Sequence, residues 1–240
     1  MSVRRLYHEQ PSSFAFTPDN KSWAEKEISK YPPGRQASAV IALLWRGQDQ
    51  EGWVSKPMIE TVARMLDMAY IRVLEVATFY TMFHLHPVGK HVVQVCTTTP
   101  CWLAGSDDVV AVCKEQISPR QDVVSDDGVF SWMEVECLGA CVNAPMLQIG
   151  KDFYEDLDGP RTEAILAAFR RGETPKPGSQ SGRHSSEPLG GPLTLTGPTL
   201  YDSSTRHHDG PAVTDAEAMK PSKGASDREA PVQKAPGAAT

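Results

Sequence analysis

Two short stretches of this chain, VCTTTPCWL at Val95–Leu103 and EVECLGACVNAPM at Glu134–Met146, decide how the rest of it is interpreted. Each stretch holds a pair of cysteines. The first pair is Cys96 and Cys101, and the second is Cys137 and Cys141. Such pairs are typical of a ligand set rather than of scattered core residues.

The residues around the two pairs predict a small α/β layer. Alternating apolar residues predict strands at 91–95 and 130–136, so each cysteine pair follows a strand. If the two strands are neighbours, four thiols meet at one edge of a sheet. The remaining expected elements are a helix at 106–116 capped by Ser106, strands at 145–150 and 151–155, and a helix at 161–171 ended by Gly172.

The spacing of the cysteines favours a binuclear iron-sulfur cluster but leaves alternatives open. A 2Fe-2S cluster needs two thiolates on each of its two irons, so two local pairs suit it. Zinc sites more often use pairs separated by two residues, a spacing that neither pair has. A zinc-stabilised interaction module, a dithiol redox enzyme and two buried apolar pairs remain as alternatives.

The other candidate ligands are weaker. The chain has five cysteines, an odd number, so a complete disulfide framework is impossible. Cys113 shares a helical face with Val110 and Ile117, and we interpret it as a core residue. Histidines occur at 84, 86, 207 and 208, and we interpret them as solvated loop residues rather than cluster ligands.

Residues 21–83 have a helical period in their apolar positions, as at 37, 40, 41, 44 and 45. This part of the chain predicts a helical bundle over 15–86. The segment 71–83 is apolar nearly all round, which favours a central place in the bundle over an interface with another chain.

Composition changes after Arg171. Residues 173–240 contain 9 prolines and 8 glycines among 68 residues, with one aromatic, Tyr201. So little apolar surface does not offset the entropy of ordering the segment. We therefore expect a disordered tail at 173–240, and we expect truncation after Gly172 to leave both the fold and a bound cluster intact.

Charge and motifs exclude several functions. The net charge of −6 gives no basic footprint for nucleic acid or anionic lipid. No apolar stretch is long enough to span a membrane, and no signal peptide is recognisable at the start of the sequence. No glycine-rich nucleotide-binding motif occurs, so we expect neither NADH nor FMN to bind this chain alone.

The two cysteine stretches, together with EVATFYTMF at 75–83, resemble the thioredoxin-like 2Fe-2S subunit of respiratory NADH:quinone oxidoreductase, complex I. The resemblance covers about residues 15–172. It implies an α/β fold in which a helical bundle at 15–86 precedes a thioredoxin-like 2Fe-2S ferredoxin domain at 87–172. The tail at 173–240 lies outside it.

The resemblance also implies a function and a ligand set. The chain is expected to be an electron-transfer subunit of an oxidoreductase, with no catalytic residue or substrate site of its own. The implied cluster ligands are Cys96, Cys101, Cys137 and Cys141. FMN and NADH are expected on a partner subunit only.

The implied partners are the FMN- and NADH-binding subunit and the large iron-sulfur subunit of complex I. The chain is then expected in the cytoplasm, peripheral to the inner (cell) membrane through the complex and without inserting into it. Relatives also serve as diaphorase-module subunits of NAD-linked formate dehydrogenases and hydrogenases, so these complexes stay as alternative hosts.

Overall fold

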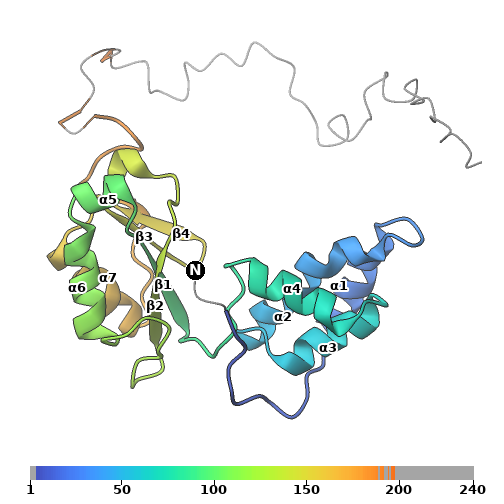
Figure 1. Ribbon diagram of the computed structural model, residues 1–240. Coiled ribbons are helices and arrows are strands. Elements are labelled where there is room, and N and C mark those ends of the chain that lie inside the picture. Colours follow the sequence, from blue (N-terminus) through green and yellow to red (C-terminus); the bar gives the residue numbers. More distant parts are fainter. Residues whose placement is uncertain (1–3, 189, 192–193, 195, 198–240) are drawn as a thin grey trace, which may run out of the picture. The chain divides into compact units, whose positions relative to one another are not determined.

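A computed structural model describes residues 4–188, 190–191, 194 and 196–197 (Figure 1). Two separate hydrophobic cores form, one within the amino-terminal helices and one around a five-stranded sheet. The mixed α/β fold expected from the sequence is confirmed. Among the described residues, no helix has the length and apolar character that crossing a membrane requires.

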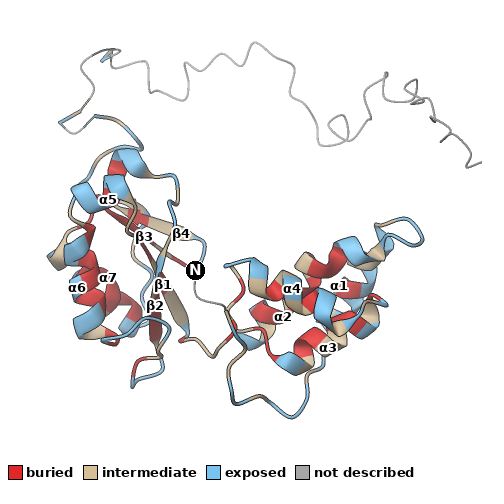
Figure 2. Ribbon diagram, viewed as in Figure 1, coloured by how far each residue is buried: buried red, intermediate tan, exposed pale blue. Residues whose placement is uncertain are grey.

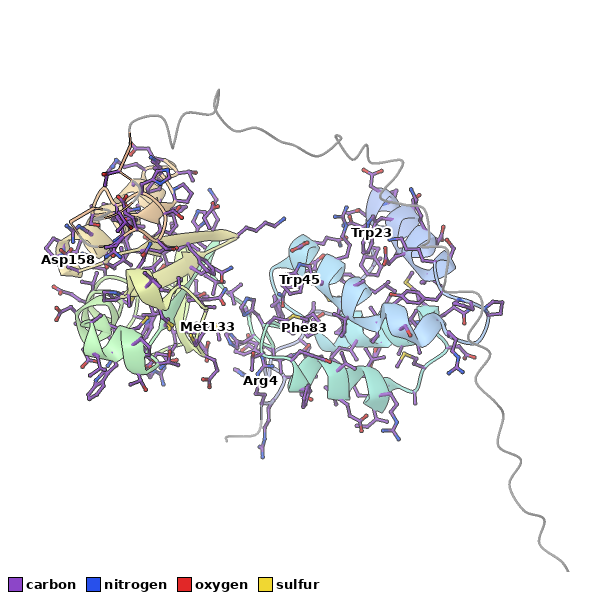
Figure 3. The ribbon with its side chains drawn as sticks, turned by 90° about the horizontal axis from the view of Figure 1, so that it is seen from above. Arg4, Trp23, Trp45, Phe83, Met133 and Asp158 are labelled. Atoms are coloured by element: carbon purple, nitrogen blue, oxygen red, sulfur yellow. The ribbon has the colours of Figure 1, made fainter. Side chains whose placement is uncertain are left out.

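The amino-terminal helices pack their apolar faces on one another. They are α1 (Pro18–Ser29), the 3-10 helix η1 (Gln36–Ala39), α2 (Val40–Glu51), α3 (Lys56–Met65) and α4 (Tyr70–Phe79). Leu43, Leu44 and Ile59 are fully buried in this core. Trp45 of α2 lies edge-on to Phe83 with ring centroids 6.3 Å apart (Figure 3).

The apolar segment 71–83 is only partly a core element. Helix α4 ends at Phe79, and Tyr80 is already extended. Val73, Ala77 and Phe83 are fully buried, whereas Phe79 is 77% exposed. The core interpretation therefore holds for one face of this segment and is wrong for the other, because apolar residues here occupy both faces of the helix.

The sheet is ordered β2-β1-β3-β4-β5. Its strands are β1 (His91–Cys96), β2 (Phe130–Val135), β3 (Met146–Ile149), β4 (Asp152–Glu155) and β5 (Gly178–Ser179). β1 is parallel to β2 and antiparallel to β3, β3 is antiparallel to β4, and β4 is parallel to β5. The four strands predicted from the sequence are confirmed, and β5 is additional.

Helices α6 (Ser106–Gln116) and α7 (Gly159–Arg170) pack side by side against this sheet (Figure 1). The sides of both helices that face the sheet are buried (Figure 2). These buried sides share a core with Trp132 and Leu147 of the strands. Asp158 caps α7 by accepting a hydrogen bond from the Arg161 N–H at 2.8 Å (Figure 3). These layers fix the strand ends from which the cysteine-bearing loops leave.

The predicted cap of α6 is wrong. Gly105, with a φ of +101°, occupies the N-cap position and Ser106 is the first helical residue. Ser106 is fully buried, and its hydroxyl oxygen has no hydrogen-bond partner among the described residues.

Replacing Ser106 by alanine is expected to stabilise the chain by about 1 kcal/mol, because a buried hydroxyl without a partner costs free energy. Urea denaturation of the purified protein measures the change in the free energy of unfolding. A lower stability in the Ser106→Ala variant would show that the hydroxyl makes a favourable hydrogen bond.

The first part of the expected tail is ordered. Strand β5 extends the sheet beyond β4, and Arg183 forms an ion pair with Asp156 at 2.8 Å. Polar contacts and strand pairing order these residues, so their low apolar content was a poor guide. Truncation after Gly172 would remove these contacts. The tail from 198 onward, with His207 and His208, lies outside the described residues.

Candidate iron-sulfur site

The two loops that carry the cysteine pairs start at the same edge of the sheet. β1 and β2 are parallel neighbours, and Cys96 at the end of β1 is in register with Val135 at the end of β2. Parallel neighbours end at the same edge, so the loops after them start side by side. The condition left open by the sequence, that these two strands are neighbours, is met.

The first pair is buried. Cys96 is the last residue of β1, and Cys101 lies in the short helix α5 (Thr99–Leu103), and each is 1% exposed. Helix α5 was not predicted from the sequence, although Pro100 in its first turn is a helix-start signal. One turn of helix brings Cys101 back toward the strand that ends at Cys96.

The second pair is exposed on the loop after β2. The sulfur atoms of Cys137 and Cys141 are 3.4 Å apart, and Cys141 begins the 3-10 helix η2 (Cys141–Asn143). Gly139 between them has a φ of +85°, a conformation that favours glycine. The glycine therefore allows the loop to fold back and bring the two sulfurs together.

Hydrogen bonds tune the thiols of the first pair. Burial by itself raises the pKa of Cys96, but hydrogen bonds, chiefly from Thr98, outweigh burial and bring that pKa below its usual value. The Thr98 hydroxyl lies 3.2 Å from the Cys96 sulfur. Burial, followed by the hydrogen bond with Cys96, raises the pKa of Cys101 to about 12.

In the second pair, too, one thiol has a lowered pKa and the other has a raised pKa. The backbone N–H of Gly139, followed by a hydrogen bond with Cys141, lowers the pKa of Cys137. The hydrogen bond with Cys137 raises the pKa of Cys141. Each pair thus has one sulfur that favours the thiolate and one that keeps its proton, and binding a metal would release that proton.

Backbone N–H groups converge on the sulfurs. Besides Gly139, the N–H groups of Leu138 and Met146 donate toward Cys96 and Cys101. Such donors offset the negative charge of iron-bound thiolates. The apolar side chains of Met146 and Leu138 pack with Cys96 and Cys101 in a small separate cluster.

The donor set fits a binuclear cluster. Cys96 and Cys101 form a buried pair, and Cys137 and Cys141 form an exposed pair whose sulfur atoms are 3.4 Å apart. A mononuclear zinc site needs three or four such ligands on one ion, whereas a 2Fe-2S cluster takes thiolates two to an iron. Two local cysteine pairs, with backbone N–H groups directed at their sulfurs, match the requirement of the 2Fe-2S cluster.

The other candidates lie elsewhere. Cys113 is fully buried in the core of the sheet, where burial raises its pKa to about 12, as its expected core position requires. His86 lies 3.5 Å from Asp122. Burial is the main cause that lowers the pKa of His84 to about 4. Neither histidine joins a group of metal-ligating side chains in the part of the chain that is described.

Large apolar side chains surround the cysteine loops on the surface. Trp102 is 56% exposed, Leu103 is 74% exposed and Val142 is 65% exposed. Trp102 and Leu103 directly follow Cys101, and Val142 directly follows Cys141. Exposed apolar groups gathered beside a site are typical of a surface that another protein covers.

Two known proteins are similar to this chain over most of their own length. An NADH-quinone oxidoreductase subunit of Rhizobium meliloti (strain 1021) is 48% identical over all of this chain and 91% of its own length. The corresponding NADH-quinone oxidoreductase subunit of Rickettsia bellii (strain RML369-C) is 54% identical over 66% of this chain and 96% of its own. The model of the thioredoxin-like [2Fe-2S] ferredoxin family matches residues 24–170. The chain belongs to this family of thioredoxin-like [2Fe-2S] ferredoxins.

Proposed function

We propose that this chain is the electron-transfer subunit of an NADH-quinone oxidoreductase, respiratory complex I, and that it holds one 2Fe-2S cluster. The proposed ligands are Cys96, Cys101, Cys137 and Cys141. The observation that carries the proposal is the placement of both cysteine pairs at the ends of two parallel neighbouring strands. The names of the relatives favour complex I over a formate dehydrogenase or hydrogenase as the host.

The chain's own residues would bind the 2Fe-2S cluster and stabilise its charge. The thiolates bind the irons in pairs, and the N–H groups of Leu138, Gly139 and Met146 stabilise the negative charge on sulfur. When bound, the cluster supplies a one-electron carrier. The exposed pair, Cys137 and Cys141, places one side of the site at the surface, where electrons can enter and leave.

The electrons must come from a partner. Hydride from NADH carries two electrons, and a flavin is the usual group that divides them into single steps. We infer that the FMN- and NADH-binding subunit covers the apolar surface of Trp102, Leu103 and Val142, and that the large iron-sulfur subunit is the other neighbour. The complex then holds the chain at the inner (cell) membrane, on its cytoplasmic side.

The proposed division of the chain follows from the two cores. The helical bundle at 15–86 contains the first core and the thioredoxin-like domain at 87–172 contains the second. The residues that follow, 173–240, begin with the ordered segment that includes β5. In this division the thioredoxin-like domain carries the cluster, and the bundle offers the exposed face of α4 for assembly.

Co-expression with the FMN-bearing subunit tests the proposal. The two chains are expected to co-purify in equal amounts. Replacing Leu103 by aspartate is expected to raise the Kd of the pair roughly tenfold or more, because a charge would be buried among apolar groups at the interface. Titration calorimetry of the separately purified chains gives the Kd.

The matched control is Ala111→Asp, which introduces the same charge on the exposed side of α6. Its Kd is expected to equal that of the unchanged chain. Failure of the unchanged chains to associate at micromolar concentration would contradict the proposed function. Equal effects of both substitutions would instead show that the surface beside Cys101 is not the interface.

A further inference from the structure

The segment 178–187, which we call the strap, crosses from the edge of the sheet to the loop that carries Cys141. It begins as β5, where Ser179 pairs with Glu155 of β4, and the Gln180 N–H then donates to the Glu155 carbonyl at 2.9 Å. The family model ends at residue 170, so the strap lies outside the part of the chain that the family describes.

Asp156 anchors the strap to the sheet. Asp156 directly follows β4 and is only 8% exposed. Arg183 donates to one of its oxygens at 2.8 Å, while the hydroxyls of Ser179 and Ser181 donate to the other at 2.5 and 3.1 Å. The Arg183 side chain is 10% exposed. A buried charge with this many donors is well compensated, so the contact is geometrically defined.

The same guanidinium holds the cysteine loop. Its other terminal nitrogen donates to the Val142 carbonyl and to the Asn143 side-chain oxygen, each at 3.1 Å. Val142 and Asn143 directly follow Cys141 in the turn η2. Arg183 therefore connects the anchored carboxylate to the residue next to a proposed cluster ligand.

Asn143 makes the second connection. Its side-chain amide donates to the Ser185 carbonyl of the strap at 2.8 Å and to the Glu155 carboxylate at 2.6 Å. The backbone carbonyl of Asn143 accepts a hydrogen bond from the Asp156 N–H at 2.8 Å. Asn143 is 3% exposed, although Val142 and Cys141 beside it are exposed. The strap thus contacts the buried side of a turn whose other side faces solvent.

We propose that the strap positions the Cys137–Cys141 loop for cluster binding, and that Arg183 is its positioning residue. This inference rests on the proposed function, because the loop's task is to hold the cluster. Without Arg183, the turn after Cys141 loses the guanidinium that links it to the Asp156 carboxylate and keeps the contacts of Asn143 with Ser185 and with the Asp156 N–H. The thiolate then has more freedom to leave its iron, and the backbone donors beside it lose their fixed direction.

The test uses the full chain with its cluster and the double variant Arg183→Met/Asp156→Asn, which leaves no unpaired buried charge. Cluster loss is followed by visible bleaching with an iron chelator, without oxygen. We expect the cluster of the double variant to bleach about tenfold faster than that of the unchanged chain. A factor of about ten in rate corresponds to the loss of one charge-assisted hydrogen bond. The electron paramagnetic resonance g-values of the reduced cluster should also shift.

Two further variants separate positioning from general stability. Arg171→Gln removes a guanidinium from an exposed ion pair with Glu173 and should bleach at the unchanged rate. Arg183→Lys keeps the charge against Asp156 but not the forked geometry, so it should bleach at an intermediate rate with g-values closer to those of the unchanged chain.

Hydrogen exchange of residues 137–143 gives a readout that needs no cluster. In the unchanged chain, the backbone N–H of Asn143 should be protected from exchange. The double variant should lose that protection, while the backbone N–H groups of β1 keep theirs. Unchanged exchange and bleaching in the double variant would overturn the role of the strap and leave the proposed function standing. Absence of a cluster from the unchanged chain would contradict the proposed function, while exchange would still decide on the strap.

Discussion

Replacing Cys137 by serine is expected to abolish or strongly distort the 2Fe-2S spectrum, whereas replacing Cys113 by serine should leave it unchanged. Under the proposed assignment, Cys137 is one of two thiolates on an iron, and a hydroxyl is a poor substitute for a soft sulfur ligand. Cys113 is fully buried in the core of the sheet, away from the cysteine loops. Visible absorption of anaerobically purified variants measures both outcomes.

The pair of variants also serves as its own control, since each removes one sulfur from the chain. Cys113→Ser buries a hydroxyl in place of a thiol and should cost some stability, without changing the ratio of iron to protein. A lost cluster in the Cys113 variant, or an unchanged spectrum in the Cys137 variant, would show that the ligand assignment is wrong.

NADH is expected to leave the isolated chain oxidised for as long as the mixture is followed. No glycine-rich nucleotide motif occurs in the sequence, and the proposed site offers thiolates rather than a hydride acceptor. Dithionite should reduce the same sample at once, because it delivers single electrons to an exposed site. Addition of the FMN-bearing subunit should make the chain reducible by NADH.

Stopped-flow absorption without oxygen follows all three reactions. The control is the FMN-bearing subunit mixed with the Cys137→Ser variant, in which the flavin should be reduced by NADH but no cluster signal should follow. Rapid reduction of the isolated, flavin-free chain by NADH would favour a self-contained redox enzyme over an electron-transfer subunit.

The sequence was a good guide to the elements that carry the cysteines. Alternation over 91–95 and 130–136 predicted β1 and β2, because this signal is local and periodic, and each cysteine pair was placed in the loop after its strand. That the two strands are neighbours, so that both loops leave one edge of the sheet, is a long-range pairing that only the structure gives. Helix α5 was missed because its five residues are too short for a helical period. The Ser106 cap failed because a tight turn at Gly105 decided where α6 begins.

The strap had no signal in the sequence. Arg183 and Asp156 are 27 positions apart, and nothing in composition distinguishes an arginine that will be buried in an ion pair from one in solvent. The low apolar content of 173–188 correctly describes a segment without a core of its own. It does not reveal that backbone pairing and a paired charge are enough to hold such a segment on a sheet edge.

Metal and sulfide analysis of the full chain, purified anaerobically from iron-replete cells, tests the central claim most directly. The account predicts about two irons and about two acid-labile sulfides per chain. It also predicts visible absorption that bleaches on reduction and the paramagnetic signal of a reduced 2Fe-2S cluster. Stoichiometric zinc in a colourless protein without labile sulfide would contradict it.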